Sequence, residues 1–206
     1  MPDYFHNNIS NEALRKEEEN YNKNFIKSLQ LNFDIDQYEG VIKDNDKSDS
    51  SPYMTVWLRN IDRLMKMVSK EINLKNYHFV DIGCGIGISS IYFFKKHKMK
   101  SYNGFDFNKN LIDKSKQIAA FLELDKKINF EYNSALKKKL DSKPYILFMF
   151  NPFGIKTLQK FINNNLNTLK KHNSVILYAN DLWINDLKGY EIIDRNNNFN
   201  LSVIYF

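Results

Sequence analysis

The feature that most constrains the fold is an alternation, from His78 onward, of short apolar runs with segments of helical periodicity. Runs of four to eight apolar residues between polar turns are typical of buried strands, and apolar residues spaced three and four apart are typical of helices. Repeated strand–helix units predict an α/β fold with a doubly wound, mostly parallel sheet and helices on both faces. Strands are expected at 78–83, 101–106, 128–133, 145–150 and 174–179, and helices at 88–97, 111–122 and 155–169.

The end of the chain departs from this alternation. The segments "GYEIID" at 189–194 and "NLSVIYF" at 200–206 have the character of strands, and only "RNNNF" separates them. A parallel connection needs about a dozen residues or more, so we expect an antiparallel hairpin and about seven strands in all. The segment "YILFMF" at 145–150 is apolar on both faces and is expected near the middle of the sheet.

Two helical patterns precede the sheet, at about 11–29 and 55–70, with the polar segment 43–51 between them. We assign residues 1–76 to an N-terminal helical flank and residues 77–206 to the α/β core, within a single domain overall. The flank is expected either to form a lid over the sheet or to cover an exposed edge, and the pattern favours neither. The polar segment contains no side chain that is expected to join a core.

The composition predicts a soluble, cytoplasmic protein. Of the 206 residues, 43% are hydrophobic, which supports a packed globule. Cys84 is the only cysteine, so no intrachain disulfide forms, as fits a reducing compartment. The N-terminus lacks the features of a secretory signal, and no apolar run approaches the roughly 18 residues of a membrane span. The net charge of +6 comes from lysines scattered along the chain, which argues against nucleic acid as a partner.

The segment "DIGCGIG", from Asp81 to Gly87, places three glycines at alternate positions between a predicted strand and a predicted helix. Glycine allows a positive φ and lets a ligand approach the backbone closely, and the following helix directs its N-terminal N–H groups to the carboxyl edge of the sheet. The dinucleotide-binding fingerprint needs glycines at positions one, three and six. Gly83 and Gly85 fit that spacing, but position six is Ile88, so the motif is not a dinucleotide fingerprint.

The pattern acid-x-Gly-x-Gly-x-Gly resembles the first motif of class I S-adenosylmethionine-dependent methyltransferases. The resemblance covers about 77–206 and implies a Rossmann-like core, methyltransferase activity, and S-adenosylmethionine as the methyl-donating cofactor. In that family the acid, here Asp81, helps to hold the amino-acid end of the cofactor. The loop that passes beneath the ligand corresponds to Gly83, Cys84, Gly85 and Gly87.

The resemblance also implies contacts with the ribose and the adenine. Asp106 stands 25 residues after the acid of the glycine motif, where the family has a carboxylate that binds both ribose hydroxyls. Asp106 is also compatible with capping the next helix, but Asn108 suits that role better. Phe107 corresponds to the apolar residue against the adenine. Asn133 and Ser134 stand where the family often has an acid that contacts the adenine amine.

Two further segments resemble a group of small bacterial methyltransferases often found near polysaccharide and glycan genes. They are "SSPYMT", upstream of the sheet, and "FNPFG", directly after the fourth predicted strand. The resemblance places Tyr53 on the cofactor side and implies that Asn151 contacts both the cofactor and the acceptor. Pro152 and Phe153 are implied to bind the substrate on the acceptor side.

The segment "NPFG" is also similar to the Asn-Pro-Pro-aromatic motif of amino-directed DNA methyltransferases, with Phe153 and Gly154 as departures. It has a fainter likeness to the Asn-Asn-Phe motif of non-SET histone-lysine methyltransferases. Asn151 is our candidate catalytic residue, because much of methyl transfer consists of holding the acceptor and the methyl group in line. The alternative is that Asn151 and Pro152 form only a turn after a strand.

These observations predict S-adenosylmethionine-dependent methyl transfer to a small-molecule or glycan-type acceptor. Two alternatives stay open: a nucleic-acid or protein amino-group methyltransferase, and a non-catalytic subunit that binds S-adenosylmethionine. No metal site is expected, because the histidines have no acid or cysteine neighbours at ligand spacing. These histidines are His6, His78, His97 and His172.

Overall fold

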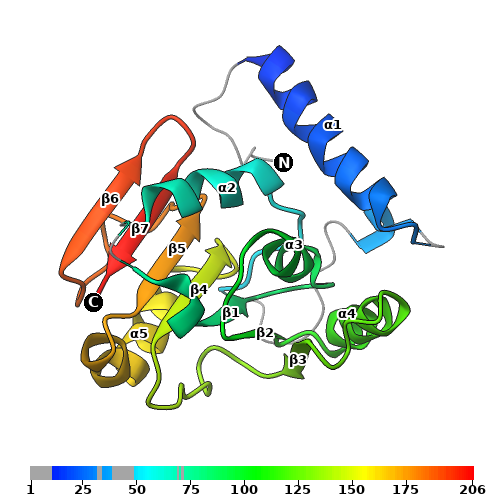
Figure 1. Cartoon of the computed structure of the whole chain (residues 1–206). Coiled ribbons are helices and arrows are strands. Elements are labelled where there is room, and N and C mark those ends of the chain that lie inside the picture. The colour runs from blue at the N-terminus through cyan, green and yellow to red at the C-terminus, as the bar shows by residue number, and fades with distance from the viewer. Residues whose placement is uncertain (1–10, 32–33, 39–48, 69, 71) are drawn as a thin grey trace.

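The computed structural model describes residues 11–31, 34–38, 49–68, 70 and 72–206, and a seven-stranded sheet forms its centre (Figure 1). The strand order is β3-β2-β1-β4-β5-β7-β6. The predicted α/β fold with a mostly parallel sheet is confirmed. The N-terminal segment 1–10 and residues 43–48 of the polar segment lie outside the described residues. The strands are β1 (His78–Ile82), β2 (Ser101–Asp106), β3 (Ile128–Tyr132), β4 (Tyr145–Phe150), β5 (Val175–Ala179), β6 (Ile192–Asn196) and β7 (Leu201–Tyr205).

Most helices lie where the apolar spacing predicted them. Within the described residues they are α1 (Glu12–Ser28), α2 (Leu58–Met67), α3 (Ile88–Lys96), α4 (Lys109–Phe121) and α5 (Ile155–Lys171), with short 3-10 helices η1 (Asp36–Tyr38) and η2 (Leu74–Asn76). The helix expected at 55–70 is shorter than predicted, because Trp57 and Val68 have extended ψ angles of 111° and 132°. Both side chains are buried, so the apolar pattern continues beyond the ends of the helix itself.

The order of the strands creates a switch point in the sheet. β1 pairs in parallel with both β2 and β4, so successive strands are added in opposite directions on its two sides. In open α/β sheets ligands bind at such a point, at the carboxyl ends of the strands. The glycine loop follows β1 there, and the "NPFG" turn follows β4. β4 is the fourth of the seven strands, as its apolar sequence predicted.

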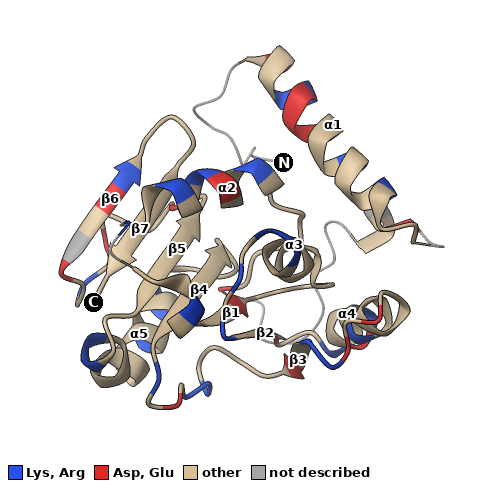
Figure 2. Ribbon diagram, in the orientation of Figure 1, with Lys and Arg blue, Asp and Glu red and all other residues tan. Residues whose placement is uncertain are grey.

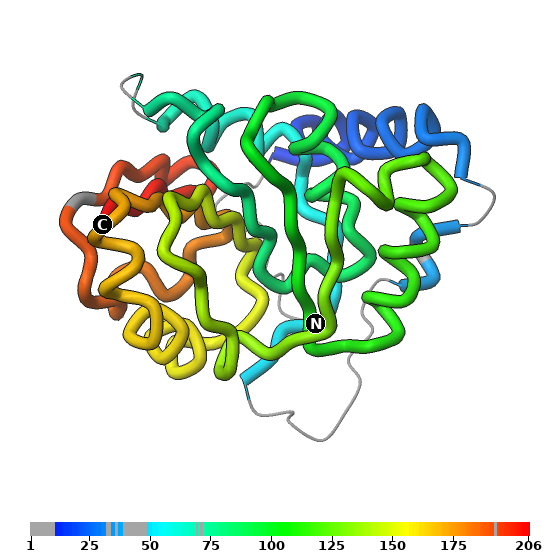
Figure 3. The backbone as a smooth tube through the Cα atoms, turned by 60° about the horizontal axis from the view of Figure 1, so that its bottom comes forward, coloured from blue at the N-terminus to red at the C-terminus, as the bar shows by residue number. Residues whose placement is uncertain are grey.

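Alternate strand residues supply two hydrophobic cores, one on each face of the sheet. In β4, Ile146 and Phe148 join the core that includes residues of α2, α3 and α4. Leu147 and Met149 join the core that includes residues of α5. Figure 3 shows α1 and α2 along one side of the sheet and α5 along the other. Helices therefore cover both faces, as predicted.

The chain ends in the predicted antiparallel hairpin. β6 pairs with β7, and β7 pairs with β5, both in the antiparallel sense. The first of these strands begins at Ile192 and not at the predicted residue 189. Gly189 has a φ of 93°, a left-handed conformation that interrupts an extended strand.

The N-terminal helices form two layers on one face of the sheet. α2 packs over β5 and β7, and α1 packs on α2 farther from the sheet (Figure 1). Leu58, Ile61 and Leu64 of α2 belong to the same core cluster as Phe79 of β1. The division of the chain at residue 76 stays a prediction. Within the described ranges, no helix is both long enough and apolar enough to cross a membrane.

Candidate cofactor and acceptor site

The glycine loop after β1 has a conformation that only glycine adopts readily. The φ angles are 72° at Gly83, 53° at Gly85 and 84° at Gly87, all in the positive range. The backbone N–H groups of Gly83 and Cys84 both donate to the carbonyl oxygen of Phe105. The loop is therefore fixed against the end of β2, and the three glycines contribute no side chains to it.

Asp106 ends β2 beside this loop and is only 7% exposed. Its Oδ2 accepts a hydrogen bond from the Gly85 N–H at 3.0 Å, and its Oδ1 accepts one from the Asn108 N–H at 2.8 Å. Burial raises the pKa of Asp106, and these backbone N–H groups oppose that rise. The Phe107 N–H also acts on this carboxylate. A carboxylate has about four acceptor directions, so at least one remains for a hydroxyl of a ligand such as a ribose. The Asn108 side chain caps α4, as predicted.

Asp81 lies in β1 and is 2% exposed. Its Oδ2 accepts hydrogen bonds from the hydroxyls of Ser89 and Ser90 at 2.6 and 2.7 Å, which joins the strand to the first turn of α3. Burial raises the pKa of Asp81 to about 6, and the two serine hydroxyls act in the opposite direction. The carboxylate thus positions the start of α3. Its contact with the amino-acid end of a cofactor stays a prediction.

The residues predicted on the adenine side gather beyond Asp106, at the end of β3. The Asn133 N–H donates to the Asp106 carbonyl oxygen at 3.0 Å. Asn133 Nδ2 donates to Glu131 Oε1 at 2.7 Å, and Asn133 Oδ1 accepts from the Ser134 N–H at 2.8 Å. Phe107 is half-buried. Sequence reasoning missed Glu131, which lies in β3 and orients the Asn133 amide.

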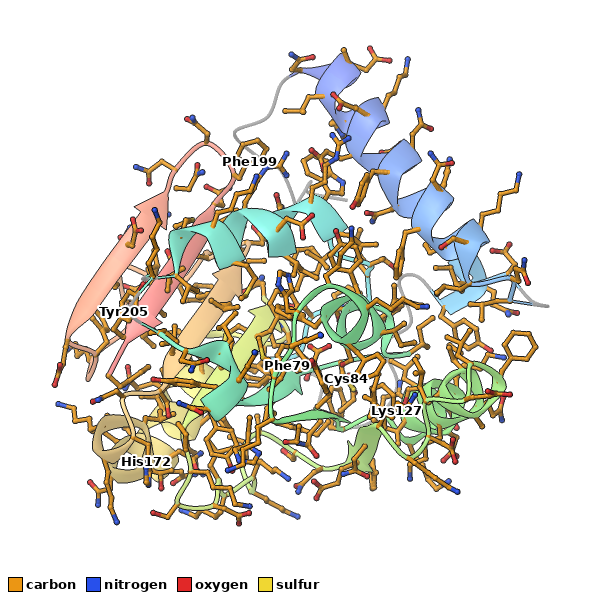
Figure 4. All side chains as sticks on the ribbon, in the orientation of Figure 1. Phe79, Cys84, Lys127, His172, Phe199 and Tyr205 are labelled. Carbon is orange, nitrogen blue, oxygen red and sulfur yellow. The ribbon has the colours of Figure 1, made fainter. Side chains whose placement is uncertain are left out.

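Cys84 lies beside α3 (Figure 4) and is 3% exposed. Burial raises the pKa of its thiol well above the usual value, so the thiol stays protonated and apolar. A Cβ on Gly104 would lie 3.0 Å from Cys84 Sγ, which shows how closely the side chain packs against β2. Its predicted contact with the cofactor stays a prediction.

The turn after β4 meets the glycine loop. Asn151 has a φ of 41° and is 7% exposed, and its Oδ1 accepts a hydrogen bond from the Tyr178 hydroxyl at 3.1 Å. A Cβ on Gly83 would lie 2.4 Å from Pro152 Cβ. Phe153 is 8% exposed and belongs to the core beneath α5. Sequence reasoning missed Tyr178, because a tyrosine within an apolar strand gives no signal that its hydroxyl reaches the next turn.

Residues 49–53, which we call the strap, lie across this turn. The Gly154 N–H donates to the Asp49 carbonyl oxygen at 2.7 Å, and the Ser51 N–H donates to the Pro152 carbonyl oxygen at 3.0 Å. These backbone hydrogen bonds hold the strap in place. The polar sequence of 43–51 gave no sign of this docking, because main-chain hydrogen bonds leave no pattern in the side chains.

Two side chains of the strap extend its contacts. Asp49 Oδ2 accepts from the Thr157 N–H at 2.9 Å, so it caps α5, whose own N-cap residue Gly154 has no side chain. The ring of Tyr53 lies so close to the glycine loop that a Cβ on Gly85 would be 2.0 Å from it. Tyr53 is therefore beside the loop where the resemblance placed it, and its contact with a cofactor stays a prediction.

The charged residues form no metal centre in the part of the chain that the structure describes. No group of three histidine, cysteine, aspartate or glutamate side chains is placed there to hold a metal ion. Lysine and arginine are spread over several helices, strands and loops (Figure 2).

The fold and this site define a class I methyltransferase, and a comparison with family models agrees. Residues 61–194 match the family described as a methyltransferase domain. The match covers more than half of the chain, and the chain belongs to this family. No curated protein matches it.

Three solved structures illustrate the likeness. An RNA methyltransferase from Salinibacter ruber, in complex with S-adenosylhomocysteine, has a TM-score of 0.50 and 11% identity, over 76% of this chain and 92% of that one. A putative sarcosine dimethylglycine methyltransferase from Galdieria sulphuraria has a TM-score of 0.50 and 15% identity, over 60% and 47%. TrmK of M. capricolum, in complex with S-adenosylhomocysteine, has a TM-score of 0.46 and 16% identity, over 69% and 66%.

At these identities the likeness shows the fold alone, and the chain spans about half the length of the Galdieria protein. The residues present fit S-adenosylmethionine as the cofactor: the glycine loop turns at the carboxyl end of β1 with a positive φ at three positions, and the buried carboxylate of Asp106 lies beside it with acceptor capacity for a ribose hydroxyl. When bound, this cofactor supplies a methyl group activated by a sulfonium. The chain therefore contains a methyltransferase domain.

Proposed function

We propose that the enzyme methylates a small-molecule or glycan-type acceptor, which enters beside the turn of Asn151, Pro152 and Phe153. The observation that carries this proposal is the contact between the turn and the glycine loop, where a Cβ on Gly83 would lie 2.4 Å from Pro152 Cβ. A group held by the loop therefore has the turn as its neighbour. Because the ring of Pro152 fixes its φ near −65°, the turn presents the Asn151 amide in a defined place.

The strap supports a compact acceptor. It is hydrogen-bonded across the turn through Asp49 and Ser51, and it brings Tyr53 against Gly85. A turn covered in this way suits a small molecule or a sugar better than a folded macromolecule. The scattered lysines and arginines also favour this choice, because a nucleic acid needs a continuous track of positive charge (Figure 2).

In this proposal the site has two sides. Asn151 is the catalytic residue, and Pro152 and Phe153 bind the acceptor. Asp106 accepts from the ribose hydroxyls, and Asp81 acts at the amino-acid end. The cofactor side as a whole comprises Tyr53, Asp81, Gly83, Cys84, Gly85, Gly87, Asp106, Phe107, Asn133, Ser134 and Asn151.

The test compares two variants: one is expected to lower the rate of methyl transfer, and the other is expected to weaken cofactor binding. A screen with labelled S-adenosylmethionine against nucleotide sugars, small acids, phenols, amines and short oligonucleotides first identifies an acceptor. Asn151→Ala should then lower the rate of methyl transfer by roughly 10²-fold or more, the scale for losing a positioning contact. S-adenosylhomocysteine binding should weaken much less, since Asp106 and the glycine loop hold the cofactor. Asp106→Asn should weaken that binding by about 2–4 kcal/mol, because two charge-assisted hydrogen bonds are weakened.

Calorimetry with S-adenosylhomocysteine and rate measurements on the acceptor distinguish the outcomes. Near-normal turnover by Asn151→Ala would mean that the turn only connects β4 to α5. Selective, strongly salt-dependent methylation of oligonucleotides would favour the nucleic-acid alternative. Binding of S-adenosylhomocysteine without transfer to any acceptor would favour a non-catalytic subunit.

A further inference from the structure

A buried tyrosine holds the candidate catalytic amide. Tyr178 lies in β5, paired with Met149 of β4, and its side chain is fully buried. Its hydroxyl reaches the turn after β4 and donates to Asn151 Oδ1 at 3.1 Å. Asn151 is itself 7% exposed, so its amide lies between the core and the site.

The burial of Tyr178 fixes the direction of this hydrogen bond. Burial raises the pKa of Tyr178 well above its ordinary value. The phenol therefore keeps its proton and acts as the donor to Asn151. The hydroxyl proton needs an acceptor, and in an asparagine side chain only Oδ1 accepts. The Asn151 amide consequently turns Oδ1 toward Tyr178.

This orientation leaves Nδ2 as the available group of Asn151. Within the ranges that the structure describes, Oδ1 is engaged by Tyr178 and Nδ2 makes no hydrogen bond. The Nδ2 group can donate a hydrogen bond only to an atom of the methyl acceptor that offers a lone pair. A target amino group donates its own protons and would need Oδ1 of Asn151 to receive them.

The carboxylates that flank the turn are already engaged. Asp49 caps α5 through the Thr157 N–H. Asp181, which follows β5, accepts from Arg195 Nε and Nη2 at 2.8 and 3.1 Å and also from the Ser202 hydroxyl. Neither carboxylate is available to remove a proton from an acceptor. An acceptor that arrives without its proton, such as a carboxylate or an acidic phenol, needs no such base.

We propose that Tyr178 orients Asn151 to donate to the acceptor, so that the enzyme methylates an oxygen that arrives ionised and not an amino nitrogen. A lone pair of that oxygen forms the new bond to the methyl carbon as the carbon–sulfur bond breaks. The bonding pair stays on sulfur, and no proton moves. This inference rests on the proposed function and specifies the acceptor class of the same site. Tyr178 is a positioning residue, because it acts through Asn151.

The first experiment tests the amide without any acceptor. In isotope-labelled protein with S-adenosylhomocysteine bound, Tyr178→Phe removes the hydrogen bond to Oδ1, so the Asn151 ¹³Cγ resonance should shift while the Nδ2 ¹⁵N resonance stays nearly in place. In the wild type, no nuclear Overhauser effect should join the Nδ2 protons to the Tyr178 ring protons ortho to the hydroxyl. Such an effect, or a large ¹⁵N shift in the variant, would overturn the orientation.

The second experiment identifies the methylated atom. Matched probes are 4-nitrophenol with 4-nitroaniline, and glucuronate with glucosamine, each supplied with labelled S-adenosylmethionine. Label should appear only on the oxygen member of a pair. Asn151→Asp keeps the shape and the acceptor for Tyr178 but has no donor. It should lower the rate of oxygen methylation at least tenfold, while S-adenosylhomocysteine affinity falls much less, because Asp106 and the glycine loop hold the cofactor.

The outcomes separate this inference from the proposed function. Label on an amine, or undiminished oxygen methylation by Asn151→Asp, would overturn the inference even though the enzyme is active. If the protein binds S-adenosylhomocysteine but methylates no probe, the failure falls on the proposed acceptors. The Asn151 resonances then decide the orientation by themselves.

Discussion

Asp81 and Asp106 stand at the ends of adjacent strands, yet their surroundings differ. The Asp81 carboxylate is held by two serine hydroxyls from α3, whereas Asp106 is held by backbone N–H groups. Burial raises the pKa of both. The Asp106 carboxylate has hydrogen-bond acceptor capacity left for a ligand, while the hydrogen bonds of Asp81 join β1 to α3. Two acids of the same type therefore serve different parts of the site.

The raised pKa of Asp81 predicts a pH-dependent contribution to stability. Its folded pKa is about 6, against an ordinary value of 3.8. Between these values the folded protein retains a proton that the unfolded chain has lost. The free energy of unfolding therefore decreases through this group as the pH rises from about 4 to about 6, by roughly 2–3 kcal/mol in total. Asp81→Asn removes the titration and keeps an oxygen that accepts hydrogen bonds.

Denaturant unfolding of the wild type and Asp81→Asn, from pH 4 to pH 7, measures this effect. The unfolding free energy of the variant minus that of the wild type should increase over this range and level off above about pH 6. Asp125→Asn, at an exposed position, makes the same change in net charge and serves as the control. A difference that does not vary with pH would show that Asp81 has no raised pKa.

Some residues of the site were predictable because their signals are local. Asp106 ends a recognisable strand, and Asn108 has the side chain and position of a helix cap, which the structure confirms. Tyr178 was not predictable in the same way. Its hydroxyl meets Asn151 only because β5 pairs with β4 and the turn brings the amide back toward the sheet. Such a contact depends on tertiary packing and leaves no periodic pattern.

Among the structural elements, the strap joins distant parts of the chain. Its Asp49 caps α5, and its Tyr53 lies against Gly85 of the loop after β1. The strap therefore connects the start of α5 with the glycine loop. A Cβ on Gly154 would lie 1.9 Å from Asp49 Oδ1, so glycine is needed there for the strap to dock.

Asp49→Ala should loosen the strap. It removes the cap on α5, which costs about 1 kcal/mol of unfolding free energy. Because the strap carries Tyr53 to the glycine loop, we also expect S-adenosylhomocysteine binding to weaken about fivefold, equivalent to about 1 kcal/mol. Thermal unfolding and calorimetry measure the two effects, with the exposed Asp125→Ala as the control. Tighter binding of S-adenosylhomocysteine would instead show that Tyr53 fills space that the cofactor needs.

The elements show the same division between local and tertiary signals. β2 and β4 were predicted to the residue, at 101–106 and 145–150, because polar turns bound their apolar runs. The ends of α2 were missed, because Trp57 and Val68 are buried in extended chain beyond the helix. The strap was missed because backbone hydrogen bonds hold it.

For the molecule as a whole, Arg63 of α2 lies where three parts of the chain meet. Its Nη2 forms an ion pair with Glu18 Oε1 of α1 at 2.5 Å, and its guanidinium carbon lies 3.8 Å from the centre of the Phe199 ring. Phe199 lies between the strands of the terminal hairpin, near α2 (Figure 4). Arg63 thus joins the outer helix, the inner helix and the end of the chain. This junction predicts that the N-terminal helices and the sheet unfold together.

Replacing Glu18 tests this prediction. The Glu18 side chain is fully buried, with 0% of its surface exposed. The neighbouring Glu17, which pairs with Arg59, is 60% exposed. Breaking a fully buried pair by removing one partner costs about 3–5 kcal/mol. The Arg63 side chain is 22% exposed and also donates to Asn60 Oδ1, and Glu18 Oε2 makes no hydrogen bond within the described residues. We therefore expect Glu18→Ala to cost less, about 2 kcal/mol. Glu17→Ala is the matched control and should have little effect, because exposed ion pairs contribute little.

Thermal unfolding, followed by the far-ultraviolet and tyrosine signals, distinguishes the possibilities. Glu18→Ala should move a single transition to lower temperature, with the two signals still coincident, because α1 is coupled through Arg63 to both α2 and the hairpin. An early separate transition in Glu18→Ala would mean that α1 detaches alone and that the sheet with α2 is an independent unit. Equal effects of Glu17→Ala and Glu18→Ala would mean that burial of the ion pair does not determine how strongly α1 is held.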